Sequence, residues 1–592
     1  MDPSRRRMLA LAAAAVCAAC QPGTAAPVNN GEFVPGTKGL IPPERITVWN
    51  PGVPGGIPVR TTVCATISAS TYGNGTTDAA AAINSALAAC PSGQVVMLPA
   101  GTYLVKSPIQ LFKSNVVLRG AGTGQTKIKL DPVAGQVPVI QIGVFWPTYN
   151  PAVNVVGGLA KGAVSIPVQN ASGFAAGDIA QIDQLDDTSY VLRGDNTWYK
   201  RGPTSNVYGP ASSGGYRSVG QQIEIGSISG NTLTITTPLH IKFDAAFSPQ
   251  VFLTNATSIG NRVDHSGVEH LYVTGGLSGN IDMLNCAYSW VLDVESDGNP
   301  ATGSGMTGIH ISVAHGFRNE IRQVYVHHAT DINPGGTAYG VALTSQSSEN
   351  LVEDSIMWYL NKPLSTQASG GGNVLAYNYV DDAIIAAQPW WQETSIDGSH
   401  ASFSHFELFE GNWTPNLSVD TTHGNAGWHT FFRNYATGIN APPSTATDSI
   451  SAVNIHGWHR EMTVVGNVLL QGKLVIKGFQ PVYESSNANF SSTADAAAAY
   501  RIGNDADPSL GYGSLDDGTA LRLLFRHGNY DAVTDGVVWD PSVSSHDLPP
   551  SLYQTAKPAF MGSELWPFVD PTRTPRVGVL PAKKRFDAMP SH

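Results

Sequence analysis

A short pattern recurs through the middle of the chain: an apolar residue, two further residues, a small or polar residue, then a second apolar residue. Its central positions follow one another at spacings of 31, 23, 34, 22 and 33 residues. Spacings near 22, lengthened where a loop is inserted, are typical of a parallel β-solenoid, whereas propeller blades repeat near 40. The six central residues are Val324, Ser355, Asn378, Asn412, Asn434 and Asn467.

A second register through the same coils supports this interpretation. Asn319, Asn350 and Asn373 each lie five residues before a central position, in three consecutive coils. Residues at one offset stack about 4.8 Å apart in a parallel sheet. We therefore expect an asparagine ladder, in which side-chain amides satisfy the backbone of the turns and one another.

The composition agrees with a chain rich in strands and turns. Of 592 residues, 62 are Gly and 39 are Pro, and 13% are charged, which is about half the usual share. This composition excludes a coiled coil or a helical bundle, and the recurring apolar residues exclude general disorder. The formal net charge of -11 disfavours a nucleic-acid or anionic-membrane partner.

The N-terminus has the order of an export signal. Ser4–Leu9 contains three arginines, and the apolar stretch that follows, through Cys20, is too short to span a bilayer. The arginine pattern resembles a twin-arginine signal, and an ordinary secretory signal is the alternative. Cleavage can follow Ala26, but Ala18-Ala19-Cys20 also resembles a lipobox. We expect an exported protein, periplasmic, outer-membrane-anchored or extracellular, whose membrane contact is limited to a lipid on Cys20.

The chain divides into six segments that differ in composition and in predicted secondary structure. The predicted hydrophilic stretch Asp186–Arg217 could overhang a cleft. The Pro-rich tail is expected to pack along the solenoid or cap it in a monomer, and the alternative is that it contacts a second subunit. The segments are a signal peptide (1–26), an extended arm (27–60), first coils with a capping helix near Ala79–Ala89 (61–151), a small inserted β-domain (152–245), the main solenoid (246–545) and the tail (546–592).

Three cysteines remain after cleavage at Ala26. Cys64 and Cys90 could form a disulfide in an oxidising compartment, or they could stay, with Cys286, as buried thiols. None shares a short ligand spacing, so these cysteines do not predict a metal site.

Three motifs near the start of the solenoid resemble a known family. They are Thr77–Ile83 (TDAAAAI), Val96–Tyr103 (VMLPAGTY) and Leu118–Gly122 (LRGAG). They are similar to the opening of the pectate-lyase superfamily of right-handed parallel β-helices, in the branch related to family 28 glycoside hydrolases. The resemblance implies an all-β, right-handed parallel β-helix with an N-terminal capping helix and a small inserted β-domain. It leaves the reaction open, because the superfamily includes hydrolases, lyases, epimerases and phage tailspikes.

The coil register also predicts where polar groups gather. Positions three and four residues after the central ones lie at strand ends on adjacent coils, so we expect an exposed stripe of aromatic, imidazole and carboxylate groups. Sugars stack on aromatic faces, so such a stripe suits a polysaccharide. The residues of the stripe are His327 and His328, Trp358 and Tyr359, Asp381 and Asp382, then Pro415 and Asn416.

Carboxylates in this region are candidates for acid–base chemistry, since glycoside hydrolysis typically uses two of them. The family 28 hydrolases carry a paired Asp, which Asp381-Asp382 resembles, and a Gly-His-Gly, which the segments around His400 and His423 resemble loosely. Their Asn-Thr-Asp element has no clear match, the nearest being Asp331–Asn333, two coils away. Asp397, in the loop that begins with Trp390-Trp391, is a further candidate and is expected to adjoin Asp381-Asp382. The alternative for Asp381-Asp382 is a solvated turn.

Histidines cluster in three consecutive coils. They can orient a carboxylate, bind hydroxyls, act as a base or hold a metal, and the alternative is a ladder of satisfied core residues. No tight ligand motif accompanies them, so no metal is predicted. The six are His400, His405, His423, His429, His456 and His459.

Two further groups keep alternatives open. Glu407 and Glu410 flank a strand, and either could be the acid, or pair with Arg433. A lyase would need an Arg or Lys base and often Ca²⁺ on Asp; the arginines in the coils are Arg318, Arg322, Arg433 and Arg460.

The sequence therefore predicts an exported hydrolase that cleaves glycosidic bonds in a polysaccharide or oligosaccharide and needs no cofactor. A polysaccharide lyase, which would use Ca²⁺, and a non-catalytic carbohydrate-binding solenoid are the alternatives. The predicted catalytic residues are Asp381, Asp382, Asp397, His400 and His423. The predicted substrate-binding residues are His327, His328, Tyr359, Trp390, Trp391, Glu410, Asn416, His429, Arg433 and His456.

Overall fold

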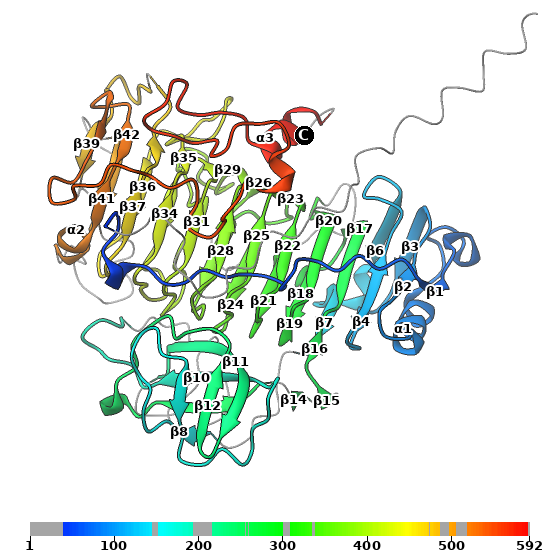
Figure 1. Cartoon of the computed structure of the whole chain (residues 1–592). Coiled ribbons are helices and arrows are strands. Elements are labelled where there is room, and N and C mark those ends of the chain that lie inside the picture. Colours follow the sequence, from blue (N-terminus) through cyan, green and yellow to red (C-terminus); the bar gives the residue numbers. More distant parts are fainter. Residues whose placement is uncertain are drawn as a thin grey trace, which may run out of the picture.

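The computed structural model describes residues 39–144, 152–192, 216–254, 256–257, 260–299, 308–333, 338–472, 474–485, 496–504 and 518–589. The predicted signal peptide, the lipobox at Cys20 and the first part of the arm lie outside them, as does 193–215 of the expected overhang. Within this part of the chain the predicted right-handed parallel β-helix is confirmed, with strands of successive coils side by side (Figure 1). None of its helices is long and apolar enough to cross a membrane.

Most coils give two short strands to one long sheet, which has 22 strands among the described residues. A residue in left-handed conformation separates the two strands of a coil, as Gln323 does with φ 54°. One run contains β20 (Trp290–Asp297), β22 (Glu320–Arg322), β25 (Leu351–Glu353), β28 (Val374–Ala376), β31 (Leu408–Glu410), β34 (Thr430–Phe432), β37 (Thr463–Val465) and β41 (Phe525–His527). The other contains β23 (Tyr325–His327), β26 (Ile356–Leu360), β29 (Tyr379–Ala383), β32 (Trp413–Thr414), β35 (Tyr435–Ala436), β38 (Val468–Leu469) and β42 (Asn529–Asp531).

The first coils and the last hairpin complete this sheet. They are β1 (Val63–Thr66), β2 (Gln94–Met97), β3 (Gly101–Val105), β5 (Val116–Arg119), β6 (Thr126–Leu130), β17 (Gly267–Thr274) and β43 (Gly536–Val538). A second sheet of 11 described strands closes the solenoid. It contains β4 (Ile109–Leu111), β7 (Pro138–Gly143), β18 (Gly279–Leu284), β21 (Ile309–Ala314), β24 (Tyr339–Thr344), β27 (Lys362–Gln367), β30 (Ile396–Asp397), β33 (Leu417–Val419), β36 (Ile450–Ile455), β39 (Val482–Ser485) and β40 (Ala497–Ile502).

Apolar side chains fill the interior, and asparagine ladders line the turns. Ile321, Val352, Leu375 and Phe409 stack in register on successive coils, each at most 1% exposed. The predicted ladder is confirmed, because the amide of Asn319 donates to Asn350 and that of Asn350 donates to Asn373. A second ladder joins Asn378, Asn412, Asn434, Asn467 and Asn529 in the same way.

A helix covers the first coil. The carboxylate of Asp78 accepts the backbone N–H of Ala80, where α1 (Ala80–Ala89) begins. Ile83 and Leu87 turn the apolar face of α1 to the core, as the sequence predicts. Cys64 and Cys90 form a disulfide, which was one of the two alternatives for the cysteines, and Cys286 is a buried thiol.

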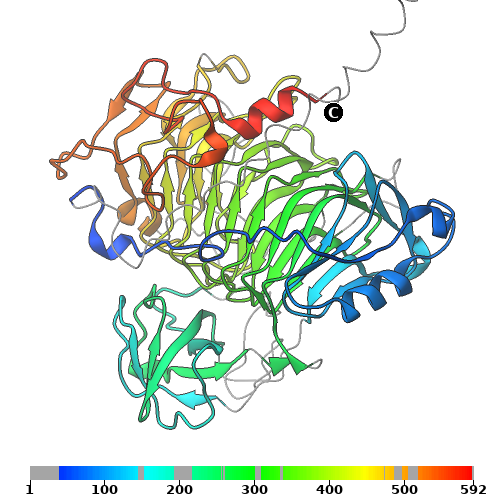
Figure 2. The same cartoon turned by 45° about the vertical axis from the view of Figure 1, so that its right-hand side comes forward.

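The inserted β-domain is a six-stranded antiparallel sheet beside the solenoid (Figures 1 and 2). Its apolar core continues onto Phe403 and Phe406 of the solenoid, and Tyr190 packs edge-to-face on Phe403. Its strands are β8 (Val153–Asn154), β9 (Ser165–Pro167), β10 (Ile179–Gln184), β11 (Val219–Ser229), β12 (Thr232–Ile235) and β13 (Gln250–Leu253). Two short pairs follow: β14 (Ala256–Thr257) with β15 (Gly260–Asn261), and β16 (Val263–Asp264) with β19 (Cys286–Ala287).

Both ends of the described chain lie across the strands of the solenoid. The arm, blue in Figures 1 and 2, crosses many coils, and Trp49 Nε1 donates to the carbonyl of Phe406. The C-terminal tail packs along the coils rather than over their end, and its helix α3 (Pro581–Asp587) contacts β26. Phe586 of α3 packs against the rings of Trp358 and Tyr379. A second short helix, α2 (Thr519–Leu523), precedes β41.

Candidate active site

A polar column runs along the outer face of the second sheet. The inward residues Leu364, Ile396 and Leu417 are in register and fully buried. Their neighbours on the opposite face are Ser365, Asp397 and Ser418, also in register. Because side chains alternate along a strand, the core residues fix the column on the outside of the solenoid.

Two carboxylates on successive coils meet at one ammonium group. Lys362, the first residue of β27, places Nζ 3.0 Å from Asp420 Oδ2 and 3.3 Å from Asp397 Oδ2. Nζ also lies 3.0 Å from Glu393 Oε1 and 2.6 Å from Thr394 Oγ1. Asp397 is 0% exposed and Asp420 3%, so the cluster is held together by strong, poorly screened electrostatics.

The environment drives the two carboxyl groups in opposite directions. Burial, with Asp420 as the next cause, raises the pKa of Asp397 well above its usual value. Burial acts in the same sense on Asp420, but Lys362 and His400 outweigh it and hold the pKa of Asp420 well below the usual range. Three carboxylates likewise outweigh burial at Lys362 and raise the pKa of its ammonium. The two shifts favour a protonated Asp397 beside an ionised Asp420.

Histidines from consecutive coils surround this pair. His400 Nδ1 lies 3.0 Å from Asp420 Oδ2, and its Nε2 lies 3.0 Å from the hydroxyl of Tyr339. Burial lowers the pKa of His400, which favours the neutral imidazole. The ring of His423, which is half-buried, contacts that of His400 edge-to-face with centroids 4.8 Å apart. His456 is buried one coil further, with Nε2 3.2 Å from the amide of Asn454.

The predicted pair Asp381-Asp382 lies elsewhere, on β29 of the first sheet. Asp381 accepts hydrogen bonds from the hydroxyl of Tyr379 (2.6 Å) and the backbone N–H of Ala441 (2.9 Å). The indole N–H of Trp358 donates to Asp382 Oδ2 at 2.8 Å. Burial, followed by the charge of Asp381, raises the pKa of Asp382 to about 6. A carboxyl with this pKa is protonated below about pH 6 and mainly ionised at neutral pH.

A cavity of about 190 Å³ adjoins Asp381. Its walls include the rings of Tyr379, Trp413 and Tyr435, and Lys583 of α3, whose ammonium lies over the first two rings. Aromatic faces beside a carboxylate and an ammonium are suited to a sugar ring, whose C–H face is apolar and whose hydroxyls need polar partners.

The stripe expected after the central positions of the repeat is in register across β23, β26 and β29, but its side chains are less exposed than predicted. His327, Trp358 and Asp381 are partners on β23, β26 and β29, as the repeat requires. His327 and Asp381 are nevertheless buried, because α3 and neighbouring side chains pack over this face. Tyr359 at 36% and Trp390 at 48% are exposed. Trp391, next to Trp390, is half-buried.

Four predicted substrate-binding residues have structural partners in the described part of the chain. Glu410 accepts the backbone N–H of Leu552 and the hydroxyl of Tyr377. The guanidinium of Arg433 donates to three carbonyls of the tail, those of Leu548, Pro549 and Val569. These two residues therefore anchor the tail. The sequence alone suggests instead that they bind substrate or pair with each other between strands.

The other two hold turns of the second sheet. His429 is fully buried, accepts the backbone N–H of Glu407 and lies 2.7 Å from the carbonyl of Gly398. Asn416 is buried before β33, where its amide oxygen accepts the backbone N–H of Ser395. Both have their polar atoms engaged with the protein backbone, so they are left out of the proposed site.

Sequence reasoning missed Lys362, Glu393, Tyr339 and Asp420. One signal for Asp420 was present, since Asp397-Gly-Ser-His400 and Asp420-Thr-Thr-His423 repeat the spacing Asp-x-x-His on consecutive coils. Lys362 carried no comparable signal, because a lysine at the start of a strand is ordinarily solvated.

The fold and the site define the chain as a right-handed parallel β-helix protein with a buried cluster of ionisable side chains on one sheet. Residues 68–156 match the family model described as rhamnogalacturonase A/epimerase, pectate lyase-like, which confirms the resemblance given by the opening motifs. No curated sequence matches the chain.

Several solved structures are similar in architecture. The tailspike protein gp49 from Pseudomonas phage LKA1 is 14% identical, with a TM-score of 0.44 over 74% of this chain and 72% of that one. The Gp54 tailspike of Acinetobacter baumannii bacteriophage AP22, in complex with capsular saccharide, is 12% identical, with a TM-score of 0.42 over 74% and 69%. The DFA-IIIase from Arthrobacter chlorophenolicus A6, in complex with GF2, is 9% identical, with a TM-score of 0.31 over 81% and 97%.

Proposed function

We propose that this protein is a hydrolase that cleaves glycosidic bonds in a polysaccharide or oligosaccharide, with Asp397 and Asp420 as its acid–base pair. The carrying observation is that two carboxyl groups bound to one ammonium have pKa values moved in opposite directions. Such a divergence is how one site supplies both a proton donor and a carboxylate at the same pH.

The chemistry follows from these states. Asp397 gives its proton to the glycosidic oxygen as the bond to the anomeric carbon breaks, and the carboxylate of Asp420 bonds to or stabilises that carbon. Water then adds its hydroxyl to the anomeric carbon and returns a proton to Asp397. One carboxylate oxygen of each Asp lies within 4.8 Å of the other. That closeness favours retention, which uses carboxyls about 5–5.5 Å apart, over inversion, which needs about 6.5–9.5 Å.

The surrounding groups have supporting roles in this proposal. Lys362 keeps Asp420 ionised, and His400 orients it through Nδ1. His423 is the half-buried imidazole at the margin of the cluster and is assigned to the hydroxyls of the substrate. The aromatic cavity beside Asp381, with Trp413 as its platform, is assigned to a second sugar, and Asp382 is the alternative acid.

The arginines of the coils support hydrolysis over elimination. Arg318 donates to the carbonyl of Gly52, and Arg322 lies between Glu320 and Glu353. Arg433 anchors the tail, and Arg460 donates to the carbonyl of Trp458. Lys362 is held protonated. Each of these five side chains is bound to another part of the protein, whereas the base of a lyase must reach the substrate.

A polysaccharide panel tests the proposal, read by new reducing ends and by ultraviolet absorbance together, with and without chelator. New reducing ends without absorbance are expected, and they should disappear in Asp397→Asn. A product that absorbs in the ultraviolet would indicate a lyase instead, because elimination leaves an unsaturated sugar. Retention of a glycan with no change in its length, in the wild type, would indicate a binding protein. Activity lost in Asp382→Asn but kept in Asp397→Asn would move the acid to β29.

We also propose that the protein is exported, as its N-terminal pattern predicts. The Cys64–Cys90 disulfide supports this, because disulfides persist in oxidising compartments. Mass spectrometry of the mature N-terminus distinguishes cleavage after Ala26 from a lipid on Cys20, and an uncleaved N-terminus in the native host would contradict export.

A further inference from the structure

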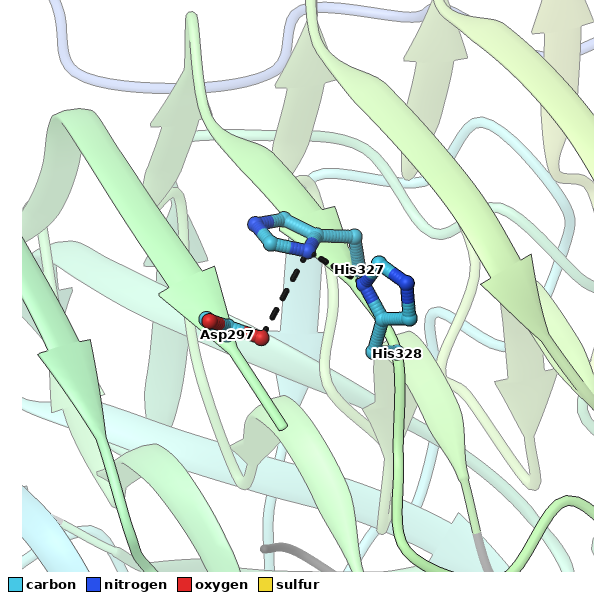
Figure 3. A group of neighbouring side chains, drawn as sticks. All are labelled: Asp297, His327 and His328. Atoms are coloured by element: carbon cyan, nitrogen blue, oxygen red, sulfur yellow. Dashed lines mark hydrogen bonds and ion pairs between the residues drawn. The ribbon is translucent and has the colours of Figure 1, made fainter. Parts of the chain in front are cut away.

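A second group of imidazole and carboxylate side chains lies on the other sheet, away from Asp397. Asp297 is the last residue of β20, and its register partner His327 is the last residue of β23. His328 follows in left-handed conformation, with φ 60°, so its ring is not on the regular side of the strand. Figure 3 shows the three side chains turned toward one another.

Their ligand atoms converge. His327 Nδ1 lies 2.7 Å from His328 Nδ1 and 3.5 Å from Asp297 Oδ1. One ligand atom from each residue lies within 4.8 Å of the other two. Two adjacent residues of one strand end thus present the same ring nitrogen to one point, with a carboxylate beside it.

Surrounding groups fix the orientation of each side chain. His327 Nε2 lies 3.3 Å from Glu295 Oε1, and the ring of Tyr325 stacks on His327 with centroids 4.1 Å apart. The hydroxyl of Tyr272 donates to Asp297 Oδ2 at 2.7 Å. An imidazole whose second nitrogen meets a carboxylate is the arrangement that orients metal-binding histidines.

We propose that Asp297, His327 and His328 bind a divalent transition-metal ion of the zinc type. Two nitrogens and one carboxylate oxygen suit Zn²⁺ and its neighbours, whereas Ca²⁺ and Mg²⁺ prefer oxygen ligands. Nitrogens about 2.0–2.1 Å from a tetrahedral ion lie about 3.3 Å apart. The 2.7 Å pair therefore needs to open by about 0.6 Å, which small side-chain rotations provide.

The cluster around Asp397 is a poorer site for such an ion, because a protein ammonium group already lies among its carboxylates. Asp397, His400 and Asp420 also bring one ligand atom each within 4.8 Å. There the ammonium of Lys362 already lies 3.0 Å from Asp420 and 3.3 Å from Asp397. A divalent cation would be repelled by that charge at close range.

The position of the site suggests what else the ion would contact. Three protein ligands leave the fourth position of a tetrahedral ion to water or to an oxygen of a bound molecule. The ring of His328 lies 5.0 Å from that of Trp358 and 5.1 Å from that of Tyr359, centroid to centroid. A sugar hydroxyl or carboxylate held on these aromatic rings is the class of ligand that this fourth position would take.

Titration of the full-length, untagged, metal-stripped protein with ZnCl₂ tests the proposal, with calorimetry as the readout. One equivalent should bind, and Co²⁺ should give the absorption of a tetrahedral nitrogen–oxygen site. His328→Asn retains a residue that tolerates left-handed backbone, and Asp297→Asn retains the acceptor for Tyr272. Each should weaken binding by roughly tenfold or more.

His270→Asn is the matched control. His270 also has positive φ and a carboxylate partner, with Nδ1 2.7 Å from Asp293 Oδ2, but no second imidazole is paired with it among the described residues. Its substitution should leave zinc binding unchanged. Unfolding transitions of all three variants verify that they fold. The proposal would be overturned if the wild type bound no zinc, or if folded His328→Asn bound zinc as tightly as the wild type. A further variant, Asp397→Asn, tests the other cluster, and loss of zinc binding in that variant alone would also overturn the proposal.

Discussion

The backbone N–H of Asp420 donates to Asp397 Oδ1 at 3.3 Å, which ties the two acidic residues together across neighbouring coils. The contact fixes the two carboxyl groups close enough for each to affect the ionisation of the other. The register of β30 and β33 places Asp420 beside Asp397. Burial of Asp397, and the charges of Lys362 and His400 beside Asp420, then produce the difference in their pKa values.

Asp397→Asn should lower kcat by about 10²- to 10⁴-fold, because it removes the proton that leaves with the glycosidic oxygen. Stability should change little, since the amide replaces a protonated carboxyl of similar shape. Turnover and thermal unfolding are measured together. Asp282→Asn is the matched control: Asp282 is half-buried, has a pKa raised to about 6 mainly by desolvation, and lies in the same outer column four coils earlier. Equal loss in both variants would contradict the assignment.

Lys362→Gln should shift the acidic limb of the kcat/KM profile to higher pH. Without the ammonium, the pKa of Asp420 rises, so a higher pH is needed to ionise it. Buried carboxylates left without their cation should also cost about 3–5 kcal/mol of unfolding free energy. A pH–rate profile and urea unfolding measure the two effects. A folded variant with an unmoved acidic limb would argue against the role given to Lys362.

Stability should fall as pH rises from about 6.5 to 8. Burial raises the pKa of Glu407 to about 8 and that of Glu410 to about 7, whereas an unfolded chain has about 4.3. The folded state thus binds more protons in this window, and stability is lost as pH passes through the folded pKa values. The lowered pKa of His429, about 3 through burial, acts only at more acidic pH. Tm against pH, with Glu410→Gln giving a shallower decline, checks this; an identical slope in the variant would contradict it.

Trp413→Ala should weaken binding of an oligosaccharide substrate by up to roughly tenfold, since the ring forms a wall of the cavity beside Asp381. The change should appear in KM more than in kcat, because the ring lies on the first sheet whereas Asp397 and Asp420 lie on the second. Trp539→Ala is the comparison, since that ring stacks on His546 and does not line the cavity. Steady-state kinetics would contradict the role if the two variants behaved alike.

The repeat predicted the solenoid, the asparagine ladder and the alignment of His327 with Trp358 and Asp381, because these depend only on coil length. It also predicted that His400 and His423 stack on neighbouring coils, and their rings are in contact. It did not place Asp397 beside them, because Asp397 was expected next to Asp381-Asp382. It could not predict what covers a strand from outside. Arg433 and Glu410 sit on outward positions that suggest a binding surface, but the tail, more than 100 residues later, occupies them. Lys362 was missed for a related reason, since its partners come from two later segments of the chain, residues 393–397 and Asp420.

The tail joins parts of the solenoid that would otherwise meet only through their neighbours. The adjacent residues Leu552 and Tyr553 bond Glu410 on β31 and Glu353 on β25, two coils apart. In a simple solenoid each coil is stabilised by the next, so that ends can fray independently. Here the loss of one coil would release contacts at the others, and the middle of the protein should therefore unfold in a single cooperative step.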